Sequence, residues 1–244
     1  SASEHHYVGN LERLHEAGTP NIVGDIRSGL VLQKKGQWQA DSLQKRSLAL
    51  SEKMRSRLST VDGLFILGPT EGNFLPTVSF NLYVGEALIS YSLVVTLLSD
   101  LYGIQARGGC SCAGPYAHEL LDIDEHQSRQ LARQMVGGEV GQRPGWVRVS
   151  LSPTMDAEEV EFVLAAIEQL AAFGNDAPWG YQSDGSGNWR DPNWARSLPP
   201  AFGESAHLSD TVTTLSSYDA RLDAAQHWLI ARAAQARLGI RHSA

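Results

Sequence analysis

The sequence predicts a compact α/β sandwich, and three observations carry this prediction. Stretches with apolar residues at the helical period alternate along the chain with short segments rich in β-branched residues. Glycine and proline turns separate these segments. Hydrophobic residues make up 42% of the 244 residues, which is ordinary for a globular protein of this length. A chain of this length accommodates one large domain, or one domain with a substantial appendage.

The expected elements follow one another along most of the chain. Helices are expected at 22–32, 40–58, 88–102, 124–136, 156–173 and 219–238. Short strands are expected at 63–68, 75–82, 104–107 and 146–151. Thr19 is the expected N-cap of the first helix, with Pro20 as its first residue, and Ser152 or Thr154 is expected to start the helix near 156.

Composition and charge exclude several classes of partner. The net charge is −7 and the chain has no block of Lys and Arg, so neither nucleic acid nor an anionic membrane is expected to bind. The longest apolar stretches, such as Leu93 to Leu98, are too short to cross a bilayer, and no export signal is visible.

The two cysteines, Cys110 and Cys112, are separated by one residue. This spacing is poor for a disulfide, and two thiols are too few for a closed zinc site, so no metal site is predicted. Free thiols of this kind indicate a reducing compartment, which is the cytoplasm.

Two further patterns have both a functional and a structural interpretation. A helix opened by Gly18-Thr19-Pro20 presents backbone N–H groups and a hydroxyl that suit a phosphate, although a plain helix cap is the commoner role of such residues. Arg148 lies in the middle of an apolar strand, where its guanidinium needs an anionic partner. That partner is either a substrate carboxylate or a nearby Asp or Glu.

Three segments together resemble the class V aminotransferase family, and in particular its cysteine-desulfurase-like members. They are Glu16 to Leu30, which contains Gly-Thr-Pro-Asn, Gly103 to Pro115, which contains Cys-Ser-Cys, and Gly145 to Leu151. Their order and approximate spacing agree with that family. The resemblance implies the C-terminal small domain of a fold-type I enzyme that depends on pyridoxal 5'-phosphate (PLP), with a short mixed or antiparallel sheet flanked by helices.

The resemblance also implies roles for individual residues. Cys112 aligns with the sulfur-accepting cysteine, whose thiolate attacks the sulfur of a PLP-bound cysteine and leaves alanine and an enzyme persulfide. Arg148 is the expected ligand of the substrate carboxylate, while Arg107 assists it or lowers the pKa of the thiol. Gly18 and Thr19 reach the PLP phosphate of the neighbouring subunit, which implies a homodimer.

Two residues near Cys112 have open roles. Cys110 is a bystander, a resolving thiol or the acceptor itself. His118 is an auxiliary acid/base candidate or a surface histidine. Gly108 and Gly109 on one side of the cysteines, and Gly114 on the other, are expected to make this loop mobile.

The cofactor lysine does not match. The chain has only Lys34, Lys35, Lys45 and Lys53, all at positions where the family has no cofactor lysine. In the family that lysine lies upstream of the Gly-Thr-Pro segment. The resemblance therefore implies that residues 1–21 join an upstream large domain, that 22–174 form the small domain, and that 175–244 are an extension with a Trp-, Pro- and Gly-rich loop and a terminal helix.

The expected function is the C-terminal portion of a cysteine desulfurase-type enzyme, which converts L-cysteine to L-alanine and is inactive without its N-terminal half. The missing half belongs to a longer chain or to a partner chain. Two alternatives stay open. One is another class V reaction, namely transamination, epimerisation or selenocysteine lyase chemistry. The other is a non-catalytic module for protein interaction or sulfur carriage.

Overall fold

The computed structural model describes residues 7–16, 18–38, 40–110, 114–137, 143–173, 180–192 and 217–237. Contacts within the chain divide it into two units, Ser1–Arg46 and Ser47–Ala244. The predicted segment boundaries at 22 and 175 differ from this division and stay predictions.

The first unit holds α1 (Leu11–His15), α2 (Ile22–Gln37) and the first residues of α3 (Ala40–Leu58). The N-cap of α2 is Asn21, whose side-chain oxygen accepts a hydrogen bond from the backbone N–H of Gly24 at 3.1 Å. The prediction that Thr19 caps this helix was wrong. An asparagine amide oxygen beside the first turn satisfies a free helical N–H as well as a threonine hydroxyl does.

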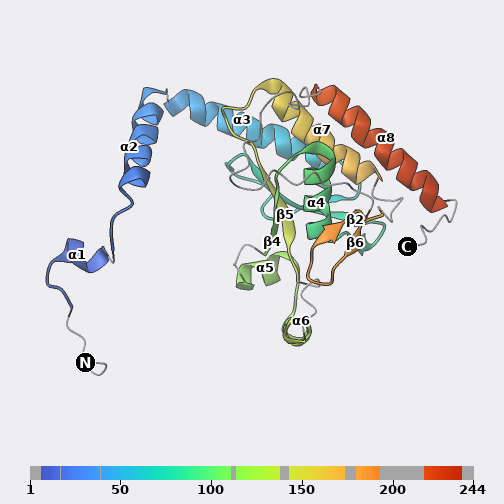
Figure 1. The fold of residues 1–244 in the computed structure, drawn as a ribbon. Coiled ribbons are helices and arrows are strands. Elements are labelled where there is room, and N and C mark those ends of the chain that lie inside the picture. The colour runs from blue at the N-terminus through green and yellow to red at the C-terminus, as the bar shows by residue number, and fades with distance from the viewer. Residues whose placement is uncertain are drawn as a thin grey trace, which may run out of the picture. The chain divides into compact units, whose positions relative to one another are not determined.

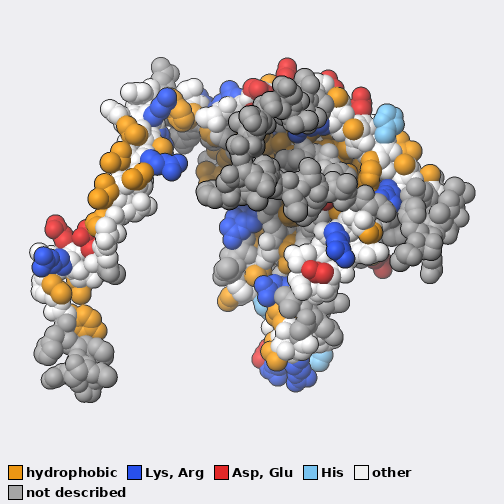
Figure 2. All heavy atoms as spheres, viewed as in Figure 1, with side chains coloured by type: hydrophobic (Ala, Val, Ile, Leu, Met, Phe, Trp, Pro, Cys, Tyr) orange, Lys and Arg blue, Asp and Glu red, His pale blue; other side chains and the backbone are white. Residues whose placement is uncertain are grey.

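The predicted apolar stripe of α2 is present but exposed. Figure 2 shows hydrophobic side chains along this helix, and none of its residues is buried. The exposed members include Ile22, Val23, Ile26, Leu30 and Leu32. The described residues therefore leave the apolar surface of α2 uncovered.

The sheet of the second unit is antiparallel throughout. Its strand order is β1 (Leu64–Ile66), β2 (Thr77–Val84), β5 (Trp146–Ser150) and β4 (Arg107–Gly109), and β3 (Ala87–Leu88) pairs with the end of β2. The strands near 63–68, 75–82 and 146–151 were predicted. The sheet was predicted to be mixed or antiparallel, and it is antiparallel.

The fourth predicted strand was placed too early. Residues 103–106 are not a strand, because they complete the end of α4 (Tyr91–Tyr102). Gly103 has a left-handed backbone with φ 70°, and its N–H bonds to the carbonyl of Ser99 while that of Ile104 bonds to Leu98. This glycine-terminated helix end uses the backbone groups that a strand would need. Pairing with β5 therefore begins only at Arg107.

One hydrophobic core lies between the sheet and three helices (Figure 1). The sheet contributes alternate residues such as Val78, Phe80 and Val147, as the period of two requires. The helices are the second half of α3, α4 and α7 (Ala157–Phe173), and Ala225 and Leu229 of the last helix also belong to this core. The residues of α7 predicted to face inward are all buried: Val160, Val163, Leu164, Ile167 and Leu170.

The start of α7 differs from the prediction. Asp156 accepts a hydrogen bond from the N–H of Glu159 at 2.8 Å, and Glu159 accepts one from the N–H of Asp156 at 3.2 Å. This reciprocal capping box makes Asp156 the cap, in place of Ser152 or Thr154. Ser152 and Thr154 instead bond to each other through their hydroxyls at 2.7 Å.

Ion pairs join α3 to α7 at the edge of the core. Arg57 binds both carboxylate oxygens of Glu168, at 2.5 and 2.7 Å. Glu161 accepts hydrogen bonds from Lys53 and Arg57, which hold the pKa of its carboxyl below the ordinary value. The Glu161 side chain is 50% exposed, so water screens its ion pairs with Lys53 and Arg57. These exposed pairs therefore contribute little to the stability of the fold.

Two short helices follow residues 110–112, here called the cysteine segment. They are α5 (Gly114–Leu120) and α6 (Glu125–Val136). The second was predicted, and it begins at a capping box between Asp124 and Gln127. The first was not predicted. It packs through Ala117 against Leu67 and Trp146 in a small second cluster of buried residues.

The described parts of the extension belong to the second unit and pack against its helices. They comprise a hairpin, β6 (Gln182–Ser183) with β7 (Trp189–Arg190), and the predicted last helix, α8 (Tyr218–Arg237), which packs on α7 and α4. Trp189 packs against the core, as predicted for the tryptophans of this region, whereas Trp179 and Trp194 lie outside the described residues. No helix in the described ranges is long and apolar enough to span a membrane.

We expect Leu164→Ala to lower the free energy of unfolding by about 2–5 kcal/mol, because this α7 side chain is fully buried and its loss leaves a cavity. Leu75→Ala is the matched control, since Leu75 is 77% exposed, and its effect should stay within about 0.5 kcal/mol. Urea unfolding followed by circular dichroism measures both. Equal effects of the two substitutions would contradict the assigned core.

Candidate functional site

Arg107 and Arg148 are direct partners across the β4–β5 ladder. Directly opposed residues of an antiparallel pair project to the same face of the sheet, with Cβ atoms about 4.5–5.5 Å apart. Ser79 on β2 is the partner of Arg148 on its other side. The three residues form a row across the sheet, on the face opposite the main core. Arg148 is half-buried and Arg107 is exposed.

Within the described ranges, neither arginine makes an ion pair with an Asp or Glu. The interpretation of Arg148 as half of a local salt bridge therefore has no support among these residues. Two like charges directly opposed across a sheet destabilise it slightly. An anion with two oxygens would offset this repulsion, because a guanidinium binds a carboxylate through parallel N–H donors.

The cysteine segment follows β4 directly. Cys110 is a free thiol, is half-buried and packs against the cluster of Leu67, Ala117 and Trp146. Cys112, the predicted acceptor, lies outside the described residues. The next described residue is Gly114, the first residue of α5.

His118 joins α5 to α6. Its Nδ1 lies 2.6 Å from the carbonyl oxygen of Gly114, and its Nε2 lies 2.9 Å from the hydroxyl of Ser128. Since a carbonyl only accepts, Nδ1 carries a proton and donates it. Nε2 then accepts from Ser128 in the neutral ring. His118 is therefore hydrogen-bonded through both nitrogens within this helix pair.

Gly18 and Thr19 belong to the first unit, and both are exposed just before α2. The helix that they precede has Asn21 as its N-cap. Their predicted contact with a cofactor phosphate stays a prediction.

Sequence reasoning did not single out Asn81. Its side chain lies in the middle of β2, directly opposite Phe65 of β1, and is 1% exposed. Neither its amide nitrogen nor its amide oxygen has a hydrogen-bond partner among the residues that the structure describes. A buried amide of this kind is costly. The available signal was a lone asparagine within the apolar alternation of 77–84.

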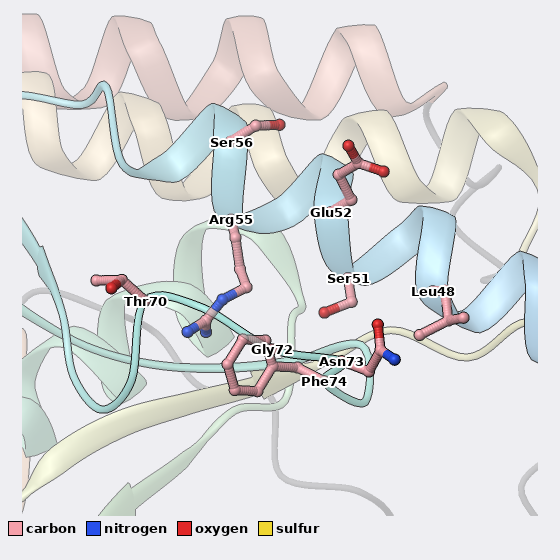
Figure 3. Close-up of a pocket in the computed structure, with 9 residues that line it drawn as sticks. All are labelled: Leu48, Ser51, Glu52, Arg55, Ser56, Thr70, Gly72, Asn73 and Phe74. Carbon is pink, nitrogen blue, oxygen red and sulfur yellow. The ribbon is translucent and has the colours of Figure 1, made fainter.

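A surface pocket of about 350 Å³ lies away from the arginine row, between α3 and the loop before β2. Figure 3 shows Arg55 and Ser51 reaching from α3 toward the loop of Phe74, while the Glu52 side chain points away from that ring. The guanidinium carbon of Arg55 lies 4.0 Å from the centre of that ring, and Arg55 also donates to the carbonyl of Pro69. None of the described residues that line this pocket is one of the predicted site residues.

Comparison with known proteins decides the family. The sequence profile described as Aminotransferase class-V matches residues 2–163, which is more than half of the chain. The chain belongs to this family. The match contains all three segments on which the resemblance was based.

Individual relatives of the class V family agree with this assignment. The chain is 28% identical over 131 residues to a probable cysteine desulfurase of Pasteurella multocida, covering 54% of this chain and 29% of that protein. It is 26% identical over 159 residues to a probable cysteine desulfurase of Methanothermobacter thermautotrophicus, covering 65% of this chain and 34% of that protein. The chain thus spans about a third of the relatives that it matches.

A solved structure gives the same fold. The apo cysteine desulfurase of Thermococcus onnurineus matches with a TM-score of 0.50 and 24% identity, over 66% of this chain and 34% of that one. The matched proteins are fold-type I enzymes, and this likeness supports the fold alone. The family match ends at residue 163, so the whole extension from residue 175 lies outside it.

Class V enzymes in general depend on PLP, which they hold on a lysine. The four lysines of this chain do not fit that role. Lys53 is hydrogen-bonded to Glu161 on an exposed part of α3. Lys34, Lys35 and Lys45 lie on exposed helix surfaces of the first unit. None of these four described side chains is held in the buried site that a Schiff-base lysine requires, so no step of the reaction is assigned to a lysine of this chain.

We expect Arg107→Gln to raise the free energy of unfolding by about 0.2–1 kcal/mol at low salt, because it removes a positive charge opposite Arg148. The gain should disappear near 1 M NaCl, where the repulsion is screened. Arg190→Gln is the matched control, since it removes an exposed strand arginine whose partner, Gln182, is uncharged. A salt-independent loss of stability in Arg107→Gln would show that the two charges do not repel each other.

Proposed function

We propose that this chain contributes the substrate-carboxylate site and the sulfur acceptor of a PLP-dependent enzyme of the cysteine desulfurase type. The observation that carries the proposal is the row of Arg107, Arg148 and Ser79 on one sheet face, immediately before the Cys-Ser-Cys segment. An amino acid carboxylate held by this row lies next to the part of the chain that supplies the thiols.

In this proposal, Arg148 binds the carboxylate through two parallel hydrogen bonds, and Arg107 adds a second positive charge. Ser79 adds a hydroxyl that can donate to the same anion. The half-burial of Arg148 supports its leading role, because partial removal from water strengthens a charged hydrogen bond.

The overall conversion is balanced without any further reagent. The thiol of Cys112 and L-cysteine give L-alanine and the Cys112 persulfide. The carbon–sulfur bond of the substrate breaks, and a sulfur–sulfur bond forms on the enzyme. The thiolate is the reacting form, and a positive charge near the thiol favours it, which is the second role proposed for Arg107.

The cofactor and its lysine come from a PLP-binding large domain outside this sequence, in a longer chain or in a partner chain. The exposed apolar surface of α2 supports an additional contact of this kind. The relatives of the class V family generally form homodimers, and we extend this assembly to the complete enzyme. Thr19 would then contact the PLP phosphate across the dimer.

We expect that the chain mixed with an upstream PLP-binding large domain forms alanine from L-cysteine, and releases sulfide once an added thiol reductant reduces the persulfide, whereas the chain alone does neither. Cys112→Ala should abolish sulfide release, because the acceptor atom is lost. Cys110→Ala is the matched control and should keep most of the activity. Activity that survives Cys112→Ala but not Cys110→Ala would reassign the acceptor, and inactivity in every mixture would favour a different class V reaction or a non-catalytic module.

We expect Arg148→Lys to lower kcat/KM for L-cysteine by about 10–100-fold in the same mixture, mainly through KM, because lysine cannot form the paired hydrogen bonds. The measurement is the initial rate of alanine formation over a range of L-cysteine concentrations. Arg129→Lys is the control, since Arg129 forms an exposed pair with Glu125 on α6. An unchanged KM in Arg148→Lys would exclude carboxylate binding by Arg148.

A further inference from the structure

The extension contacts both ends of α4, the helix beneath the arginine strands. At the first turn, the indole N–H of Trp189 donates to the hydroxyl of Ser92 at 3.0 Å. At the last turn, the hydroxyl of Tyr181 donates to Asp100 at 3.0 Å. These bonds join α4 to residues that the family match does not include.

The first turn of α4 also contacts the strands that precede the cysteine segment. A Cβ atom at Gly108 would meet Cδ2 of Tyr91 at 2.7 Å and Cγ2 of Val95 at 3.1 Å. A Cβ atom at Gly145 would meet Cε1 of Tyr91 at 2.8 Å. The Tyr91 ring therefore lies directly on the backbone at two glycines, and no side chain separates them.

These glycines are next to the proposed site. Gly108 lies between Arg107 and Gly109 in β4, and Cys110 follows. A Cβ atom at Gly145 would also meet the Cα of Gly109 at 2.7 Å, so the two strands approach closely at this end. A shift of Tyr91 would therefore displace the backbone that leads into the thiols, because close-packed contacts transmit small movements.

We infer that the extension is a positioning element for Cys110, the first residue of the cysteine segment, and acts through Trp189, the first turn of α4 and Tyr91. Its functional meaning rests on the proposed role of the thiols. Trp189 holds Ser92, the neighbour of Tyr91, and the Tyr91 ring sets the backbone at Gly108. The last turn of α4, bound by Tyr181, is distant along the helix from these glycines.

The measured quantity is the rate of alkylation of Cys110 by iodoacetamide, followed by mass spectrometry of its peptide. The 244-residue chain carries Cys112→Ser in every variant, so that Cys110 is the single thiol. Trp189→Phe keeps an aromatic ring but removes the N–H donor. Ser92→Ala removes the acceptor of the same hydrogen bond, together with the 2.8 Å bond between the hydroxyls of Ser92 and Ser90. Tyr181→Phe removes a comparable hydrogen bond at the other end of α4.

We expect Trp189→Phe and Ser92→Ala each to raise the alkylation rate of half-buried Cys110 by about two- to tenfold, the change in local opening that one hydrogen bond accounts for. Tyr181→Phe should change it less than twofold. The free energy of unfolding, measured in urea, should fall by similar amounts in all three, so that the difference in thiol reactivity reports local positioning.

A second route tests the same contact without touching the extension. Gly108→Ala introduces a methyl group against Tyr91 and should also raise the alkylation rate, whereas Gly29→Ala, at a site with nothing within 4 Å, should not. Unchanged Cys110 reactivity in Trp189→Phe, Ser92→Ala and Gly108→Ala would overturn the inference. Equal increases of the Cys110 alkylation rate in Tyr181→Phe and Trp189→Phe would also overturn the inference. The thiol reactivity would then follow the global stability of the fold and not the local contact.

This experiment requires neither PLP nor substrate. A failure here leaves the proposed desulfurase reaction standing, and a failure of the activity assays leaves the positioning contact standing.

Discussion

The antiparallel pairing of β5 with β2 and β4 is the constraint on which the rest of the structure depends. Because side chains alternate along a strand, β5 buries Val147 and Val149 in the core and presents Arg148 on the other face. The same register brings Arg107 opposite Arg148. A slip of one residue would bury the arginine and expose the valines, so the packing of the core fixes the position of the charged row.

The core also determines what the cysteine segment can do. On one side, α4 lies directly on the strands at Gly108 and Gly145 through the Tyr91 ring. On the other side, Cys110 packs on the small cluster with Ala117 and Trp146. The start of the thiol segment is thus anchored between two packed layers.

The two units differ in how completely their apolar surfaces are used. In the second unit, the helices cover the inner face of the sheet, and the extension adds the ion pair of buried Asp191 with partly buried Arg232. In the first unit, the apolar residues of α2 are exposed. The class V relatives are about three times as long as the part that this chain matches. An exposed row of apolar side chains of this kind is typical of an interface.

The sequence by itself determined the family, most helices and the inward residues of α7, because these depend on local periodicity and on motifs that are continuous in the chain. Its errors came where neighbouring groups compete for the same role: Asn21 caps α2 in place of Thr19, and the glycine-terminated end of α4 delays β4 to Arg107. Only the tertiary structure placed Arg107 beside Arg148, buried the amide of Asn81 and joined Trp189 to α4. These contacts link residues far apart in sequence, and strand register and packing, which no local pattern encodes, decide them.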